Sequence, residues 1–464
     1  MGADSVIYIR TDGNSKISTG HLVRCISIAQ ALLDQDRKVC FLVSDEESLS
    51  LLESFWKDQT QNITQKKEAL WGSHASALVL ATARYDQPEN ELAELLSLFD
   101  VPKSTSGLLP SFSESSANLS SDSYNDSDRP ILLIDSYFVT PAYLNALNKV
   151  ARTAYIDDLK KFDYPVDLLL NYDIISPKEL PKLQSFYTSA KFLLPGAEYT
   201  PLRRQFSSYT PVFREIPQNV LITSGGSDPY GFCLKLLTAL QGRYFSSGTA
   251  RPSSYDDALS TGNLYPSASG ILSQEEWPSL TFHVVMGKLF SPEEKQSLHS
   301  LASTRKNIQL HEGLTDLAPL MKKCDLAISA AGTTLCELSA LGVPAISFTM
   351  ADNQVEFALG FDRAGAIPYA GDIRDEDSNG AYIENIRDED SNGAYIENIR
   401  DEDSNGAYIG DIRDKHSDKV YERIMDFLAS MLENPEKRKL LQNKSRSLID
   451  GKGSSRIAEA LCRL

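Results

Sequence analysis

Hydrophobic residues along this chain recur at two different spacings, and the change from one spacing to the other marks a strand followed by a helix. Residues 6–9 form a short apolar run rich in β-branched side chains, which is typical of a buried strand. A polar loop follows and ends in Thr-Gly-His at residues 19–21. Apolar residues then recur at helical spacing, at Leu22, Ile26, Ala29 and Leu33. The pattern predicts a strand, a loop and a helix whose N-terminus carries His21.

The same order returns twice in the second half of the chain. Residues 219–229 indicate a buried strand that runs into a Gly-Gly turn, and apolar residues at helical spacing follow. Residues 325–348 indicate a strand, a turn of small residues, a helix and a second strand. Open α/β sheets bind ligands where the carboxyl end of a parallel strand meets the N-terminus of the next helix. All three loops are therefore candidate binding sites.

The first loop holds groups that can move a proton. Histidine changes its charge near neutral pH, so His21 is a candidate base or water-orienting group. Asp12 or another loop residue would fix its tautomer. A helix-capping turn that happens to contain a histidine would give the same pattern, and one such turn is a weak signal.

The helix predicted within residues 325–348 begins with residues that suit a nucleotide. The backbone N–H groups and hydroxyls of residues 332–334 (Gly-Thr-Thr) can hold a diphosphate against the positive end of the helix dipole. Glu337, one turn further on, can accept hydrogen bonds from ribose hydroxyls. Ordinary N-capping by the two threonines, with Glu337 as the capping partner, is the structural alternative.

Short motifs from one end of the chain to the other occur in an order shared with a known family. They are Arg10-x-Asp12, Gly20-His21-x-x-Arg24-Cys25, Ile134-Asp135-Ser136-Tyr137, Tyr155-Ile156-Asp157-Asp158, Pro195-Gly196-x-x-Tyr199-x-x-Leu202-Arg203, Ser224-Gly225-Gly226-Ser227-Asp228-Pro229, Ala331-Gly332-Thr333-Thr334-Leu335-Cys336-Glu337, Asp352-Asn353-Gln354 and Ile449-Asp450-Gly451-x-Gly453. The chain resembles the UDP-sugar hydrolases of pseudaminic acid biosynthesis, which are related to glycosyltransferases of the MurG type. It departs from their usual Gly-x-Gly-His at Ser18, which stands in place of the first glycine.

The resemblance implies an α/β fold with two Rossmann-like domains facing a cleft, as in GT-B glycosyltransferases. It implies that UDP-2,4-diacetamido-2,4,6-trideoxy-β-L-altropyranose and water react by inversion at the C1–O bond to give the free sugar and UDP, without a cofactor or metal. The expected catalytic residues are His21, Asp12 and Tyr137. Residues expected to bind the substrate or UDP are Arg10, Gly20, Arg203, Gly225, Gly226, Ser227, Gly332, Thr333, Thr334, Glu337, Asn353 and Gln354. Tyr137 and Asn353 match family positions that lie against the sugar.

Two other functions stay open from the sequence. A GT-B glycosyltransferase that moves sugar from a UDP-sugar to an acceptor would share the phosphate and ribose features, and some carry Gly-His in the first loop. A non-catalytic sugar-nucleotide-binding protein would share only the nucleotide features. His21, Asp12 and Tyr137 together favour an enzyme over such a protein.

Length and composition fit a two-domain enzyme. A chain of 464 residues is long for one domain, and we expect domains at residues 1–205 and 206–464. The net charge of −17 argues against nucleic acid as a partner. Six cysteines without Cys-x-x-Cys spacing indicate reduced thiols in a cytoplasmic protein. The sequence has neither an apolar run of about eighteen residues nor a signal-peptide pattern, so no stable membrane insertion is expected.

Three segments are expected to be insertions. Residues 102–129 and 245–278 are rich in small and polar residues, and the first is expected to be mobile. Residues 373–411 hold three near-identical copies of a thirteen-residue unit, each with a net charge of −3. The unit begins like a calcium loop, but Ile386 stands where the bidentate carboxylate of such a loop belongs. The repeats are therefore expected to be a tolerated surface expansion.

Overall fold

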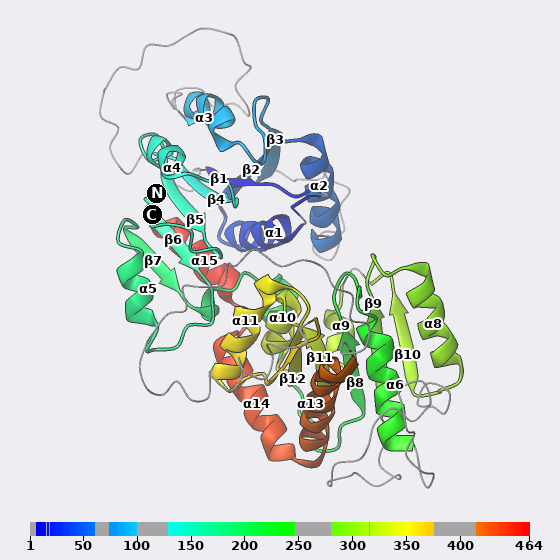
Figure 1. Cartoon of the computed structure of the whole chain (residues 1–464). Helices are drawn as coiled ribbons and strands as arrows, with labels where there is room; N and C mark the ends of the chain where they lie inside the picture. The colour runs from blue at the N-terminus through cyan, green and yellow to red at the C-terminus, as the bar shows by residue number, and fades with distance from the viewer. Residues whose placement is uncertain are drawn as a thin grey trace, which may run out of the picture. The chain divides into compact units, whose positions relative to one another are not determined.

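The computed structural model of the chain describes residues 6–14, 16–17, 19–60, 74–99, 129–245, 280–314, 316–374 and 414–464. The chain divides into two compact units, Met1–Ser208 with Ile449–Leu464 and Tyr209–Leu448. Each unit is built on a sheet of parallel strands flanked by helices (Figure 1), so the expected pair of Rossmann-like α/β domains is confirmed. The expectations for Ser18 and for the three insertions fall almost wholly outside the described residues.

The strands of the N-terminal unit are paired in the order β3-β2-β1-β4-β5-β6-β7. They are β1 (Val6–Thr11), β2 (Lys38–Val43), β3 (Ala75–Val79), β4 (Ile131–Asp135), β5 (Arg152–Ile156), β6 (Leu168–Asn171) and β7 (Phe192–Pro195). Alternate residues of β4 pack into two different apolar clusters, one on each face of the sheet. The order reverses direction between β1 and β4, and such a reversal is where open α/β sheets bind ligands.

Helices cover both faces of this sheet. They are α1 (Gly20–Leu33), α2 (Glu46–Thr60), α3 (Leu92–Phe99), α4 (Pro141–Leu147), α5 (Leu180–Phe186) and α15 (Gly453–Arg463), with short 3-10 helices η1 (Pro88–Glu91), η3 (Ala197–Tyr199) and η4 (Arg204–Phe206). Residues 22, 26 and 29 of α1 are fully buried, as their spacing predicts. The buried face of α1 therefore packs onto the sheet and fixes the position of its N-terminus.

The C-terminal helix belongs to the N-terminal unit, which differs from the expected domain range 206–464. Ile457, Ala458 and Leu461 of α15 are fully buried in the same apolar cluster as α1. A close approach holds the start of α15: a Cβ on Gly453 would lie 2.1 Å from the carbonyl oxygen of Thr200. Figure 1 shows α15, at the red end of the colour bar, beside β5 and β6. The apolar face of α15 finds its partner far back in the sequence, and a linear division of the chain cannot show this.

The C-terminal unit repeats the same topology. Its strands are β8 (Asn219–Thr223), β9 (Thr281–Met286), β10 (Ile308–Glu312), β11 (Leu326–Ala330), β12 (Ala345–Thr349) and β13 (Tyr369–Asp372), in the order β10-β9-β8-β11-β12-β13. Its helices are α6 (Phe232–Phe245), α8 (Pro292–Ser303), α9 (Ala318–Met321), α10 (Thr333–Leu341), α11 (Asp352–Arg363), α13 (Asp414–Glu433) and α14 (Pro435–Leu448). Here the order reverses between β8 and β11. No helix among the described residues of either unit is both long and apolar enough to cross a membrane.

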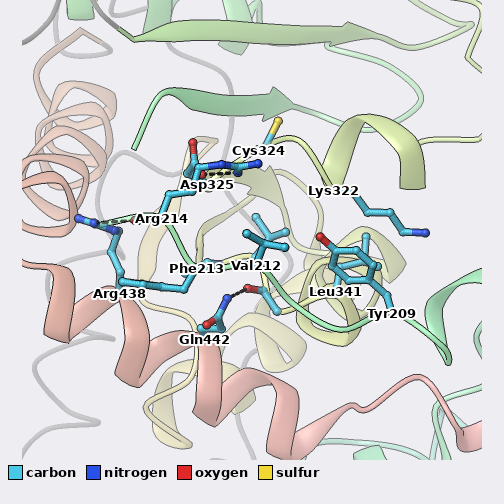
Figure 2. A pocket seen from close by; sticks show the side chains of 13 residues that line it. Tyr209, Val212, Phe213, Arg214, Lys322, Cys324, Asp325, Leu341, Arg438 and Gln442 are labelled. Carbon is cyan, nitrogen blue, oxygen red and sulfur yellow. Dashed lines mark hydrogen bonds and ion pairs between the residues drawn. The ribbon is translucent and has the colours of Figure 1, made fainter. Parts of the chain in front are cut away.

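Helix α14 fastens the segment by which the chain enters the C-terminal unit. Arg438 is fully buried and donates hydrogen bonds to the carbonyl oxygens of Arg214 and Glu215 and to those at the end of α13. Gln442 donates to the carbonyl oxygen of Gly342 at 2.7 Å (Figure 2). Arg438 and Gln442 line a pocket together with Asp325 and Pro344, which precede β11 and β12. It is therefore at the opposite edge of the sheet from the loops that follow these strands.

Candidate functional site

His21 lies between β1 and α1 of the N-terminal unit. Strand β1 ends at Thr11, and α1 begins at Gly20. Thr11 pairs with Asp135, the last residue of β4, in the neighbouring strand. The loops after β1 and β4 therefore start side by side, at the point where the strand order reverses. This is the edge of the sheet at which the sequence places the candidate base.

A short hydrogen bond joins His21 to Asp135. Nδ1 of His21 lies 2.6 Å from Oδ1 of Asp135, and both side chains are buried. Burial alone would raise the pKa of Asp135, but the charge of Arg24 and the hydrogen bonds from Arg24 and His21 outweigh it and hold that pKa well below its usual range. The carboxylate therefore accepts the bond and Nδ1 donates it. Nε2 is then the acceptor of the neutral ring, and it makes no hydrogen bond with the described part of the protein.

This arrangement is the one that a general base needs. A carboxylate that accepts from Nδ1–H fixes the tautomer and stabilises the imidazolium that forms when Nε2 takes a proton. Histidine oriented in this way can activate water or a hydroxyl group near neutral pH. His21 and Asp135 together can therefore remove a proton from an oxygen nucleophile.

Tyr137 stands against the imidazole of His21. The two rings meet edge to face, with centroids 4.4 Å apart. The phenol donates a hydrogen bond to Oδ2 of Asp158 at 3.1 Å. Burial and the nearby Asp158 carboxylate raise the pKa of Tyr137 to about 12, so the phenol keeps its proton at neutral pH. Tyr137 thus borders His21, and its expected place against the sugar stays a prediction.

Arg10 and Asp12 have other partners than the sequence suggests. The guanidinium of Arg10 donates to both carboxylate oxygens of Glu91 at 2.8 Å and to Asp12 at 2.6 Å, and its side chain is only 3% exposed. The second oxygen of Asp12 accepts from the backbone N–H of Ser44. These contacts occupy the polar atoms of both side chains and join the end of β1 to η1 and to the residue after β2. They do not support the expected roles of Arg10 in substrate binding and of Asp12 in fixing the tautomer of His21.

Three residues of the His21 cluster have no role assigned from the sequence. They are Asp135, Arg24 and Asp158. Each stands at a position that carries a signal, because Asp135 and Asp158 follow apolar strands and Arg24 lies one helical turn after His21. The signal is incomplete in the sequence, because only the pairing of β1 with β4 brings Asp135 next to His21.

The expected nucleotide-binding residues of the C-terminal unit follow three neighbouring strands. Gly225, Gly226 and Ser227 follow β8, the Gly-Thr-Thr run follows β11, and Asn353 follows β12. Strand β11 pairs with β8 on one side and β12 on the other, and all are parallel. The three loops therefore lie along one edge of the sheet, around its point of reversal, and the sheet brings together most of the residues that were predicted separately.

The N-terminus of α10 is open to a ligand. Gly332 is its N-cap and Thr333 its first residue, and no side chain caps the helix, so the N-capping alternative for the threonines is not found. A Cβ on Gly332 would meet nothing within 4 Å, and its φ of −170° is available to any residue. Packing therefore does not require glycine here, whereas a close-lying anion would. Glu337, one turn inside, is half-buried and has a partner within the protein.

The Gly-Gly turn after β8 combines strain with a tight contact. Gly225 has a φ of +92°, in the region that favours glycine. Asp228 ends the turn and accepts hydrogen bonds from the first two backbone N–H groups of α6, so it caps that helix. A Cβ on Gly287, in the next loop, would lie 2.2 Å from the carbonyl oxygen of Gly226. The turn is therefore a rigid element that holds Ser227 at the edge of the sheet.

The remaining predicted residues have mixed surroundings. Asn353 is exposed at the start of α11, whereas Oε1 of Gln354 accepts from the backbone N–H of Met350 and closes its own helix start. The guanidinium of Arg203 lies 5.2 Å from the ring of Phe206 in the N-terminal unit. Roles of these residues in UDP binding stay predictions. The described residues contain no group of three His, Cys, Asp or Glu side chains that could hold a metal ion.

Comparison with known proteins agrees with this architecture. Residues 264–379, which contain β11, α10 and α11, match the Glycosyltransferase family 28 C-terminal domain. The chain is similar to MurG from Acinetobacter baumannii, with 12% identity, a TM-score of 0.52, and coverage of 99% of this chain and 100% of that one. It is equally similar to UDP-GlcNAc 2-epimerase from Neisseria meningitidis bound to UDP-GlcNAc, with 13% identity, a TM-score of 0.52 and the same coverage.

Two further results bound what the comparison means. UGT89C1 from Arabidopsis thaliana, solved with quercetin, is 11% identical with a TM-score of 0.51, again over 99% of this chain and 100% of that one. No curated protein matches the chain by sequence. Identities this low establish the fold alone. The chain therefore has a GT-B-like α/β fold, with two Rossmann-like domains.

Proposed function

We propose that this protein binds a UDP-sugar and hydrolyses its C1–O bond to give the free sugar and UDP. The observation that carries the proposal is the buried His21–Asp135 pair, which leaves Nε2 as a proton acceptor at the ligand-binding edge of the sheet. The resemblance of the chain's motifs to the UDP-sugar hydrolases of pseudaminic acid biosynthesis supports a diacetamido-trideoxy sugar as the substrate.

The reaction divides between the two units. In the N-terminal unit, Nε2 of His21 takes a proton from water while the water oxygen attacks the anomeric carbon on the face opposite UDP. The C1–O bond breaks, and its electron pair leaves with the diphosphate. In the C-terminal unit, the backbone N–H groups at the start of α10 and the positive end of its dipole stabilise the charge on that leaving group. The step needs no metal ion to balance.

The comparisons support the nucleotide part of the proposal. The matched glycosyltransferase domain contains the β11–α10 turn and the start of α11, where we expect the diphosphate and ribose. A structural relative from Neisseria meningitidis was crystallised with UDP-GlcNAc. UDP-sugar binding by the C-terminal unit is therefore the part of the proposal with the broadest support.

Transfer of the sugar to an acceptor is the second candidate. The match to a glycosyltransferase domain favours it over hydrolysis. The chemistry differs only in the nucleophile, because Nε2 of His21 would take the proton of an acceptor hydroxyl group instead of water.

The test is an assay of UDP release and free sugar with a panel of UDP-sugars, with and without candidate acceptors. Release of free sugar in equal amount to UDP without acceptor supports hydrolysis, and turnover that requires an acceptor supports transfer. His21→Ala should lower kcat by roughly 10²–10⁴ and leave UDP binding intact. His299→Ala is the matched control, because His299 is exposed on α8 of the other unit. Near-normal turnover by His21→Ala, or UDP binding without turnover by the unaltered protein, would overturn the proposal.

A further inference from the structure

Arg24 is the cation that binds the residues around His21. Its Nε donates to Oδ2 of Asp135 at 2.6 Å, and Nη2 donates to Oδ1 of the same carboxylate. Nη1 donates to Oδ2 of Asp158 at 2.8 Å and also to the phenol oxygen of Tyr172. One guanidinium on α1 thus binds residues at the carboxyl ends of three adjacent strands, β4, β5 and β6.

The fork of Arg24 fixes the carboxylate that orients His21. Both oxygens of Asp135 are engaged by a planar, bidentate partner, so the carboxylate cannot rotate away from Nδ1 of His21. Nη2 of Arg24 also lies 2.9 Å from that Nδ1. Because Nδ1 donates to Asp135, this short distance is a contact between two donors. The positive charge of Arg24 is therefore beside the ring that would become positive on protonation.

Among the residues that the structure describes, few charged or titratable groups contact His21 or the residues bonded to it. They are Arg24 and Cys25 on α1, Asp135 and Tyr137 after β4, Asp158 after β5 and Tyr172 after β6. The thiol and the phenols are neutral at pH 7, because burial raises the pKa of Cys25, Tyr137 and Tyr172. The two carboxylates favour the imidazolium form of His21. Arg24 is the one cation among these groups and opposes it.

We propose that Arg24 is a positioning residue that holds His21 as the neutral Nδ1–H tautomer, with Nε2 ready to accept a proton. This inference rests on the proposed function for its catalytic meaning, since a base must be neutral before it can act. Its structural content is independent of any substrate. Arg24 acts through Asp135 and through its own charge.

Removing the charge of Arg24 should favour the imidazolium form of His21 over the neutral form. Arg24→Gln removes the cation beside the ring and leaves the Asp135 carboxylate facing His21, so the protonated form of His21 should be favoured. The acid limb of the kcat/KM profile should move to higher pH, and activity lost at neutral pH should return at alkaline pH. Arg24→Lys keeps the charge without the fork, so the acid limb should stay near its original position while kcat falls.

The experiment combines two readouts on the full chain. The first is the NMR titration of the His21 imidazole in the protein without substrate, with its signals assigned from their loss in His21→Gln. The second is the pH profile of kcat/KM with the UDP-sugar that the protein turns over. Arg204→Gln is the matched control, because Arg204 is an exposed arginine of the same unit that pairs with Asp34.

The outcomes separate this inference from the proposed function. A His21 titration that moves up in Arg24→Gln and stays in Arg24→Lys and Arg204→Gln supports the role of Arg24, whatever the protein catalyses. A lower melting temperature with an unmoved His21 titration and an unmoved acid limb would overturn it and leave Arg24 a purely structural residue. Absence of UDP-sugar turnover in the unaltered protein would overturn the proposed function alone.

Discussion

Asp135 is a buried carboxylate that binds both His21 and Arg24. It is fully buried, yet it receives hydrogen bonds from His21, Arg24 and the thiol of Cys25. Burial by itself would make the carboxyl easier to protonate, and the charge of Arg24 together with the hydrogen bonds from Arg24 and His21 reverses that tendency. The charge of Asp135 is therefore needed both for the tautomer of His21 and for the folded state.

Asp135→Asn should damage catalysis and stability together. An amide can donate to Nδ1 of His21 and so favour the wrong tautomer, and the same change in a Ser-His-Asp triad lowers kcat by about 10⁴. The variant also leaves Arg24 with Asp158 as its one carboxylate partner, so the free energy of unfolding should fall by about 3 kcal/mol at pH 7. Urea unfolding and steady-state kinetics measure the two effects, with Asp34→Asn on the exposed face as control.

The pH dependence of this loss has a defined sign. The pKa of Asp135 is lowered in the folded protein, so its stabilisation is complete above the ordinary carboxyl pKa of about 4. It is lost as the pH falls below that value. The gap in unfolding free energy between wild type and Asp135→Asn should therefore shrink below pH 4. A gap that does not change with pH would contradict the lowered pKa.

At the residue level, the sequence placed His21 at a helix start, where the structure has it, but did not identify Asp135 as its partner. Local spacing identifies a histidine at a helix start, because the apolar residues at helical spacing begin directly after His21, and α1 begins at Gly20. It cannot identify Asp135 as the partner, because 114 residues separate the two and only strand pairing joins them. Asp12 is the carboxylate nearest to His21 in sequence, yet it forms an ion pair with Arg10.

Among the elements, we expect the start of α10 to matter most for nucleotide binding. Its N–H groups lack side-chain caps, and Gly332 is not required there by packing or by its backbone angles. Helix starts of this kind bind phosphate because several N–H groups point the same way at the positive end of the dipole. The element therefore makes predictions that separate ligand binding from folding.

Gly332→Ala should weaken UDP binding without lowering the melting temperature, because the added methyl group meets only the space that a diphosphate would fill. Glu337→Ala should weaken UDP binding by about 1–3 kcal/mol if a ribose hydrogen bond is lost. Calorimetric titration with UDP and thermal unfolding measure both. Gly287→Ala is the contrasting control, since its Cβ would collide with the backbone of Gly226 and should destabilise the fold. Unchanged UDP affinity in the first two variants would move the nucleotide elsewhere.

The same helix start leads to a prediction about metal ions. If N–H groups and dipoles stabilise the leaving diphosphate, turnover of the UDP-sugar should persist in EDTA. Loss of turnover in EDTA that Mg²⁺ or Mn²⁺ restores would favour a metal-dependent enzyme. Inclusion of EDTA in the assay of UDP release decides between the two.

The elements themselves were largely predictable. The strand expected at residues 6–9 lies within β1, and the strand, helix and strand expected within residues 325–348 are β11, α10 and β12. Apolar runs and helical spacing suffice for these because tertiary packing agrees with local pattern. The strand order, which places β1 beside β4 and β8 beside β11, could not be predicted from the hydrophobic pattern, because many pairings of apolar parallel strands bury the same surface.

For the whole molecule, the two sheets share the same reversal of strand order, and each reversal carries part of the proposed site. One reversal, between β1 and β4, carries His21 and Asp135, and the other, between β8 and β11, carries the glycine turns. The C-terminal helix α15 returns to the N-terminal unit, so both units contain sequence from the second half of the chain. A linear boundary near residue 205 describes the first crossing between units and misses the return.

The repeats offer the sharpest test at this scale. Strand β13 ends at Asp372, after which Ile373 is buried in the core and Arg374 binds Asp372 and Asp352. Residues 412–414 repeat Ile-Arg-Asp, the residues found at 373–375. Deletion of residues 373–411 therefore joins Asp372 to the same three residues and supplies the same anchor. It also removes a charge of −9 from the total of −17, because each of the three units contributes −3.

The shortened protein should fold, bind UDP and turn over substrate much as before, because loop length enters the free energy only logarithmically. Deletion of residues 373–413 is the control: it removes the Ile-Arg anchor as well, exposes the core site of Ile373 and leaves Asp372 and Asp352 without their arginine. Its melting temperature should drop below that of the shorter deletion. If instead the 373–411 deletion abolishes a Ca²⁺-dependent rise in melting temperature or cuts kcat sharply, the repeats take part in function. The neutral-expansion hypothesis would then be wrong.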